Sequence, residues 1–437
     1  MDGVITCEEA YWDAAGLTVR DILESPAYLG LNPAQYSPIV NLFYQNLSRM
    51  GRDEWRKYLP GELISFCKSR GINSNWDLAY IALAIHLSPL LGPILEHLLM
   101  AGGIWHGPRN FPFATQQGGQ QATEEPQVQN NEPDPQLQEA LSPIWERLID
   151  AIRQEDWQAV LQLGDFHLWG DFLRAHHQSA IPVQNVRSLF EDGIGSGVRG
   201  LALLEAMNVF ISPAAEGQKP WFSRQSTLWH EVRDLFQQWY LGADLYTERY
   251  GAMPAYGPKP GLIHQEEPLL GREQTHASLK ALQEAGYTLA IATGRPRLEI
   301  LTPMQRWNML GYFDEQRIVT HDEAETAEQC LQQKHPGLSL SKPHPYVFLR
   351  AAYPEQSDEE LLERLDDRQH TFDEVLVVGD AQADIWAAHE MNCPSVGVLS
   401  GVLGQTEPRL LEEANPTLMV NNFEQFARLM ANHPVSA

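Results

Sequence analysis

Two carboxylates stand close together in the segment VLVVGDAQAD, toward the C-terminal end of the chain. Asp380 directly follows the apolar run 375–378 and a glycine, and Asp384 comes four positions later. A short apolar run closed by Gly-Asp predicts a buried parallel strand, and the residues from Asp384 onward have the spacing of a helix. Both carboxylates would then lie at the carboxyl end of a strand, where open α/β sheets bind ligands. Oxygen ligands suit Mg²⁺, although a helix cap beside a solvated Asp explains this pair equally well when it is taken alone.

Two further residues could hold a phosphoryl group. Thr293 follows the apolar run 287–292, and its hydroxyl could donate to a phosphate oxygen, although a lone Thr at this place is more often a cap or turn residue. Lys342 stands in the segment SKPHP, where two prolines stiffen the backbone around it. A lone Lys before a helix is usually solvated, but one near Asp380 could neutralise both a phosphate and a carboxylate.

The elements that must position these residues alternate between helix and strand. The pattern predicts a helix over 275–285, closed by Gly286, and strands at 287–292, 318–320, 375–378, 394–399 and 418–420. Strands separated by helices indicate a doubly wound parallel sheet, so we expect an α/β core in the C-terminal part.

The larger N-terminal part has helical periodicity instead. Helices are expected over most of 8–100 and 142–250, followed by a Pro/Gly linker at 251–261. Residues 106–138 are rich in Gln, Pro, Gly and Asn and predict a loop or a disordered insert. The uncharged stretch 78–95 has the length of a membrane span, but Ser88-Pro89 is a helix start, so we expect two buried helices at 76–87 and 89–100.

Composition restricts the partners. The net charge is −26, from 31 basic and 57 acidic residues, which argues against nucleic acid and anionic membranes. The four cysteines are widely spaced and show no metal-ligand spacing, so we expect reduced thiols in a cytoplasmic protein. The chain opens on acidic and polar residues, which is not typical of a signal peptide. No pattern predicts the oligomeric state.

The order of the chemical residues is more specific than any one of them. Thr293, then Lys342-Pro343, then the GDxxxD segment 379–384, each after a predicted strand, resembles motifs two, three and four of the haloacid dehalogenase-like (HAD) hydrolase superfamily. The first motif of that family, DxDG(T/V), matches only in its last positions, Met1-Asp2-Gly3-Val4. The resemblance covers 1–7 and roughly 262–425.

The resemblance implies a Mg²⁺-dependent phosphatase that acts on a small phosphorylated metabolite through an aspartyl-phosphate. Asp2 would be the general acid and base, Thr293, Gly294 and Lys342 would hold the phosphate, and Asp2, Asp380 and Asp384 would hold the metal. The resemblance also implies a core formed by 1–7 and 261–437, with 8–260 inserted as an unusually large helical cap.

The nucleophile of the family is the first Asp of motif one, which would lie one residue before Met1. The family's central strand would also precede Met1, and burying four or five apolar side chains contributes roughly 6–15 kcal/mol. A natural core would not easily lose this much, so we expect the natural start to lie upstream and to supply both features. The alternative is a non-catalytic phosphate sensor or scaffold. Carbon–halogen hydrolysis uses the same fold without a metal, and the GDxxxD pair argues against it.

Other signals carry less weight. The GxGxxG spelling at 195–200 follows no strand, and three histidines lack partners at metal spacing: His167, His176 and His177. Lys259 and Arg295 could reach a substrate, but most such residues are solvated. Cleavage of a phosphonate would need a cap lysine at the site, and the sequence identifies none. The tryptophans of the cap are expected in its core: Trp145, Trp157, Trp169, Trp229 and Trp239.

Overall fold

The computed structural model describes residues 1–25, 58–59, 61–72, 74–86, 198, 200, 202–204, 227–254, 257–367 and 369–435. They belong to two compact units. The first, called the core unit below, comprises Met1–Ala14, Ile64–Ser74 and Gln237–Ala437. The second comprises Ala15–Leu63 and Asn75–Phe236. The predicted insert at 106–138, the helix at 89–100, most of the GxGxxG segment, His167, His176, His177 and three of the tryptophans lie outside the described residues.

Five short parallel strands form the centre of the core unit, as β1 (Ile291–Ala292), β2 (Ile318–Val319), β3 (Val377–Gly379), β4 (Ser395–Val398) and β5 (Leu418–Val420). Parallel pairing and the intervening helices confirm the predicted α/β class. The hydrogen bonds divide the strands into two sheets, β1-β2 and β3-β4-β5, where a single sheet was expected.

The strand positions follow the predictions, but four of the five strands are shorter. The run 287–292 is reduced to the two residues of β1, because only Ile291 and Ala292 pair with β2. The last strand, β5, has the predicted bounds, and β3 begins two residues later than predicted and ends one residue later, at Gly379. The remaining residues of each apolar run lie in loops or turns beside the strand.

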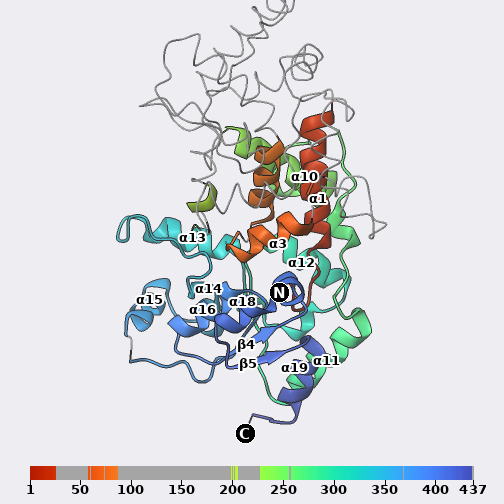
Figure 1. Ribbon diagram of the computed structural model, residues 1–437. Coiled ribbons are helices and arrows are strands. Elements are labelled where there is room, and N and C mark those ends of the chain that lie inside the picture. The colour runs from red at the N-terminus through yellow and green to blue at the C-terminus, as the bar shows by residue number, and fades with distance from the viewer. Residues whose placement is uncertain are drawn as a thin grey trace, which may run out of the picture. The chain divides into compact units, whose positions relative to one another are not determined.

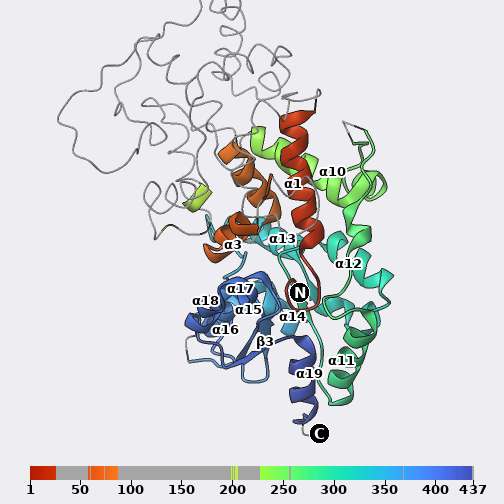
Figure 2. The same cartoon turned by 45° about the vertical axis from the view of Figure 1, so that its right-hand side comes forward.

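Helices cover both sheets. They are η3 (Leu262–Gln265), α11 (Arg272–Glu284), α12 (Arg297–Arg306), η4 (Leu310–Tyr312), η5 (Glu315–Arg317), α13 (His321–Leu331), α14 (Tyr346–Ala352), α15 (Asp358–Asp366), α16 (Gln382–Glu390), α17 (Val402–Thr406), α18 (Pro408–Glu413) and α19 (Phe423–Ala431). Figures 1 and 2 show α11 and α19 side by side, and α16 packs on β3 and β4. Gly286 ends α11 with a φ of 88°, as its left-handed cap role requires.

One of the apolar clusters contains residues of both sheets. Ile291 and Ile318 of the first sheet share a buried cluster with Val396, Val398 and Val420 of the second. The cluster is completed by side chains of α11 and α19 and by two residues near the N-terminus: Leu279, Leu282, Phe423, Phe426, Val4 and Ile5. The N-terminal turn is therefore packed into the core, next to strands of both sheets.

Most of the described residues between 9 and 250 are helical, as predicted. They include α1 (Glu9–Glu24), α3 (Gly61–Ser69), residues 75–86 and α10 (Thr227–Tyr250). In the second unit Trp229 is buried and donates to Asp77 at 2.7 Å, which places this tryptophan in a core as expected. Residues 78–85 are also buried. Within the described residues, no helix is long and apolar enough to cross a membrane.

Candidate active site

The N-terminal turn places Asp2 at the carboxyl ends of the strands. The backbone N–H groups of Ile5 and Thr6 both donate to the Met1 carbonyl, at 2.9 and 3.0 Å. Thr6 also pairs with Pro268, and Leu269 N donates to the Ile5 carbonyl at 2.9 Å. These bonds tie residues 1–6 to the loop that precedes α11.

Asp380 lies between two glycines that come from distant parts of the chain. A Cβ atom on Gly3 would lie 2.0 Å from Asp380 Oδ2, and so would a Cβ atom on Gly401. Gly3 also has a φ of 64°, which an L side chain rarely adopts. The Ser400 hydroxyl donates to the Gly3 carbonyl at 2.6 Å and holds the two loops together. Only glycine at these two positions leaves room for the Asp380 carboxylate.

Lys342 bridges the two sheets at their carboxyl ends. Its Nζ donates to the Ala292 carbonyl at the end of β1, at 3.1 Å, and to Asp384 Oδ1 in α16, at 2.8 Å. Thr293, the next residue after β1, is buried and accepts a bond from Arg295 N through its Oγ1, at 3.2 Å. Gly294 is exposed, and a Cβ atom there would meet nothing within 4 Å. The predicted phosphate-binding residues therefore occupy one loop and the lysine beside it.

Negative charge gathers around Asp380. Burial raises the pKa of its carboxyl well above the ordinary value, and the charges of Glu8, Asp384 and Asp2 raise it further. The Met1 amino group acts in the opposite direction on Asp380. Burial and the charge of Lys342 lower the pKa of that amino group, while the three Asp carboxylates raise it. Asp2, Asp380, Asp384, Lys342 and the Met1 amino group therefore share one electrostatic environment.

Arg295, which was expected to be solvated, is the main partner of Asp2. Its side chain is 3% exposed, and its Nε and Nη2 lie 2.7 and 2.5 Å from Asp2 Oδ1. Thr6 Oγ1 donates to the same oxygen at 2.8 Å. These bonds and the arginine's charge outweigh burial and lower the pKa of Asp2 to about 2, so Asp2 is ionised at neutral pH.

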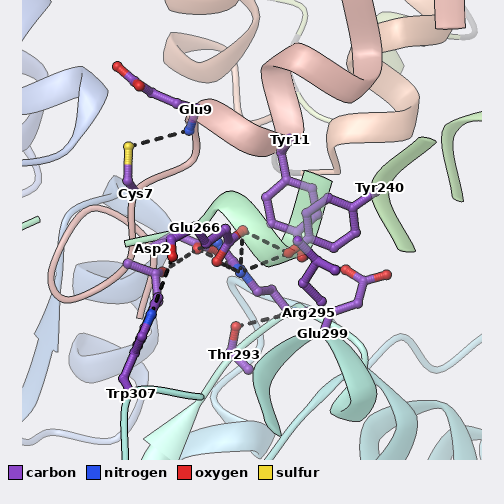
Figure 3. Close-up of polar contacts among 12 residues, drawn as sticks. Asp2, Cys7, Glu9, Tyr11, Tyr240, Glu266, Thr293, Arg295, Glu299 and Trp307 are labelled. Carbon is purple, nitrogen blue, oxygen red and sulfur yellow. Dashed lines mark hydrogen bonds and ion pairs between the residues drawn. The ribbon is translucent and has the colours of Figure 1, made fainter. Parts of the chain in front are cut away.

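A second group of buried polar residues surrounds Arg295 (Figure 3). Glu266 accepts from Arg295 Nη1 at 3.0 Å and from the Tyr240 hydroxyl at 2.7 Å. Tyr11 stacks on Tyr240 with a centroid separation of 4.1 Å, and its hydroxyl donates to Glu299. No sequence pattern predicts this cluster, because its members come from four separate segments and each alone has the pattern of an ordinary helix or loop residue.

A lysine from the predicted cap segment also reaches this region. Lys68 of α3 pairs with Glu8 at 2.6 Å, and both side chains are largely buried, at 10% and 7% exposure. Glu8, and then Asp2 and Asp380, raise the pKa of Lys68 against the effect of burial. The sequence alone did not identify this lysine, because its pairing with Glu8 joins segments 60 positions apart. A lysine that attacks a carbonyl needs a lowered pKa, so the raised pKa argues against phosphonate chemistry. Lys259 lies instead over the Trp239 ring, at 4.5 Å.

The structure brings together most of the residues predicted for the site, but not a complete set of metal ligands. In the described residues, no group of three His, Cys, Asp or Glu side chains could hold a metal ion. Asp384 bonds to Lys342, and its other oxygen accepts from Ala381 N at 3.3 Å, as a helix cap does. The carboxylate oxygens of Asp380, lodged between two glycines and surrounded by negative charge, match the hard oxygen ligands that Mg²⁺ prefers.

Comparisons with known proteins agree with this geometry. Residues 339–426 match the HAD-hydrolase-like family, and the matched stretch contains Lys342, Asp380 and Asp384. A solved structure, the X-ray structure of a Northeast Structural Genomics Consortium target, is similar with a TM-score of 0.62 and 23% identity. The similarity covers 99% of this chain and 97% of that chain, and at this identity it shows the fold alone. No curated protein matches significantly.

The structure shows an α/β fold of parallel strands with helices between them, which the similar solved structure shares. More specifically, the stretch 339–426, which holds Lys342, Asp380 and Asp384, matches a HAD-like hydrolase domain.

Proposed function

We propose that the protein is a Mg²⁺-dependent phosphatase of a small phosphorylated metabolite. One observation supports this most strongly: Lys342 Nζ bonds both the carbonyl that precedes Thr293 and the carboxylate of Asp384. These two bonds connect motifs two, three and four, although Ala292 and Asp384 are 92 positions apart in the sequence. An ammonium beside exposed backbone and a hydroxyl is a suitable environment for a phosphoryl group.

Phosphate would bind at the loop after β1. Lys342 supplies positive charge, Thr293 supplies a hydroxyl, and Gly294 leaves open space beside the backbone. The protein carries a net charge of −26, so this local positive charge is needed to attract an anionic substrate.

Asp380 and the Asp2 carbonyl would hold Mg²⁺, with Asp384 supporting the site. Asp380 fits this role because burial, and then the charges of Glu8, Asp384 and Asp2, raise its pKa, so a cation there would reduce the repulsion among these carboxylates. When bound, the ion would neutralise the charge of the phosphoryl oxygens.

Asp2 would serve as acid and base. In the reaction that the resemblance implies, a carboxylate nucleophile attacks phosphorus and the bond from phosphorus to the ester oxygen breaks. Asp2 is ionised in the free site, so it would first take up a proton, which the negative charge of a bound phosphate favours by raising its pKa. Asp2 would then pass that proton to the ester oxygen. Asp2 then removes a proton from water, which attacks phosphorus, releases inorganic phosphate and frees the attacking carboxylate. The nucleophile stays a prediction.

The test is release of phosphate from a panel of phosphate monoesters by the protein encoded by the full open reading frame, with Mg²⁺ or with EDTA. We expect Mg²⁺-dependent release that falls by roughly 100-fold or more in Lys342→Met and Asp380→Asn, because each removes charge stabilisation from the transition state. Asp373→Asn, which changes an exposed carboxylate outside the site, is the control. Absence of release from every ester contradicts the proposal. If phosphate then still stabilises the protein against heat, the sensor alternative holds instead.

A further inference from the structure

We propose that Arg295 is a positioning residue that fixes the rotation of the Asp2 carboxylate, so that Oδ2 faces the substrate. The inference rests on the proposed function, because it assigns a task to the acid and base of that reaction. Arg295 was given no role by the motifs, and the contacts that support this inference all lie within the core unit.

Two hydrogen bonds and an ion pair converge on one oxygen of Asp2. Arg295 Nε and Thr6 Oγ1 donate to Oδ1 at 2.7 and 2.8 Å, and Arg295 Nη2 lies 2.5 Å from the same oxygen as an ion pair. Among the described residues, none donates a hydrogen bond to Oδ2. A carboxylate held at one oxygen by two hydrogen bonds and an ion pair cannot rotate without breaking them, so the other oxygen keeps a fixed direction.

Arg295 is itself held from behind. Its Nη1 donates to both oxygens of Glu266, at 3.1 and 3.0 Å, and lies 3.3 Å from the Tyr240 hydroxyl. The guanidinium carbon lies 4.3 Å from the centroid of the Tyr11 ring. Carboxylates on two edges and an aromatic ring on one face fix the plane of the guanidinium, as Figure 3 shows.

These contacts exclude the simpler role of a phosphate-binding arginine. The Arg295 side chain is 3% exposed, and two of its nitrogens already face Asp2 while the third faces Glu266. A substrate oxygen could bind the guanidinium only after Asp2 or Glu266 had been displaced. The arginine therefore acts on the substrate through Asp2.

The reaction requires that Asp2 Oδ2 point toward the oxygen that leaves phosphorus. A proton must pass from Asp2 Oδ2 to the oxygen that leaves phosphorus, and transfer of this kind needs an approach to hydrogen-bond distance. A carboxylate that rotates freely would spend less time in that direction. The loss should be large for an alkoxide leaving group, which needs the proton, and small for nitrophenolate, which leaves as a stable anion.

The experiment compares Arg295→Lys with the unchanged full-length protein on two substrates, glycerol phosphate and p-nitrophenyl phosphate. Lysine keeps the positive charge between Asp2 and Glu266 but lacks the planar fork. We expect kcat for glycerol phosphate to fall at least ~10-fold more than kcat for p-nitrophenyl phosphate, since acid catalysis contributes about 10²–10⁴-fold. Arg317→Lys is the matched control, because the Arg317 side chain donates to the carbonyls of Ala351 and Ala352, away from the residues proposed for the site.

Equal losses on both substrates, or no loss, would overturn the proposal, because a merely structural arginine does not distinguish leaving groups. If the unchanged protein releases no phosphate from either ester, the proposed function fails, and a second measurement decides the role of Arg295. Crystal structures of the unchanged protein and of Arg295→Lys should then differ in the rotation of the Asp2 carboxylate. An unchanged carboxylate in the variant would refute the positioning role.

Discussion

Glu299 is a carboxyl group enclosed by the core unit, where the Tyr11 hydroxyl donates to it. Burial raises its pKa from 4.5 to about 7, although Tyr11, Gln237, Arg295 and Arg249 act in the opposite direction. The folded chain therefore holds a proton on Glu299 between about pH 4.5 and 7, where the unfolded chain does not. The contribution of this group to stability is present below pH 4.5 and is lost as the pH rises through 7.

Glu299→Gln should remove this dependence. The shift corresponds to roughly 3 kcal/mol, so the free energy of unfolding of the unchanged protein should fall by that order, relative to the variant, between pH 4.5 and 8. Urea unfolding at several pH values measures the difference. Glu284→Gln, at a side chain that is 67% exposed, should keep the unchanged pH profile. Parallel profiles for Glu299→Gln and the unchanged protein would show that Glu299 titrates normally.

The glycines around Asp380 allow a second test on single residues. Gly3→Ala combines a positive φ with a clash against Asp380 Oδ2, Gly401→Ala has only the clash, and Gly271→Ala has only the positive φ. The left-handed backbone costs about 1–2 kcal/mol for an L residue. Gly3→Ala should therefore lose the most stability in thermal unfolding, and it should share with Gly401→Ala a loss of Mg²⁺ affinity that Gly271→Ala does not show. Equal Mg²⁺ affinity in all three variants would separate Asp380 from the metal.

Between elements, the contact of Lys342 with Asp384 connects the loop before α14 to the first turn of α16. The Lys342 side chain is 18% exposed and the Asp384 side chain 9%, so the pair is shielded from water and salt. A double-mutant cycle with Lys342→Met and Asp384→Asn should give a coupling energy of about 1–3 kcal/mol. The surface pair of Lys334 with Glu359, which is 63% and 54% exposed, should give less than about 1 kcal/mol. Similar values for the two pairs would show that the bridge adds nothing to the stability of the site.

Sequence patterns predicted the order of elements well, and they failed where pairing depends on distant neighbours. The runs 287–292 and 394–399 mark strands correctly, but their lengths depend on which residues find a partner strand. The N-terminal turn between the sheets could not be predicted for the same reason, because its bonds to Pro268 and Ser400 join segments hundreds of residues apart.

Site residues could be predicted where they stand in a recognisable motif. They could not be predicted where their role depends on being buried beside a distant residue. Thr293, Lys342 and Asp380 stand in short patterns with a chemical meaning. Arg295 and Lys68 do not, because a charged residue in a sequence gives no sign of whether a carboxylate will be buried beside it. The pairs with Asp2 and Glu8 arise only when remote segments fold together.

For the whole molecule, the net charge of −26 should oppose an anionic substrate at long range. Added salt shortens the Debye length from about 30 Å at 0.01 M to about 8 Å at 0.15 M. At constant free Mg²⁺, kcat/KM for a phosphate monoester should therefore rise between these salt concentrations, since the repulsion acts over a longer range than the attraction of Lys342. Steady-state kinetics in NaCl measures this effect. A decrease would mean that local positive charge controls the approach of the substrate.

The central claim is that residues from the N-terminal turn, the β1 loop, the Lys342 loop and the β3 loop form one phosphate site. A crystal structure of the full-length protein with Mg²⁺ and inorganic phosphate tests it most directly. We predict a phosphate ion within hydrogen-bond distance of Thr293 Oγ1 and Lys342 Nζ, with Mg²⁺ on the Asp380 carboxylate. Phosphate bound away from these two groups, or Mg²⁺ bound only elsewhere, would contradict the account.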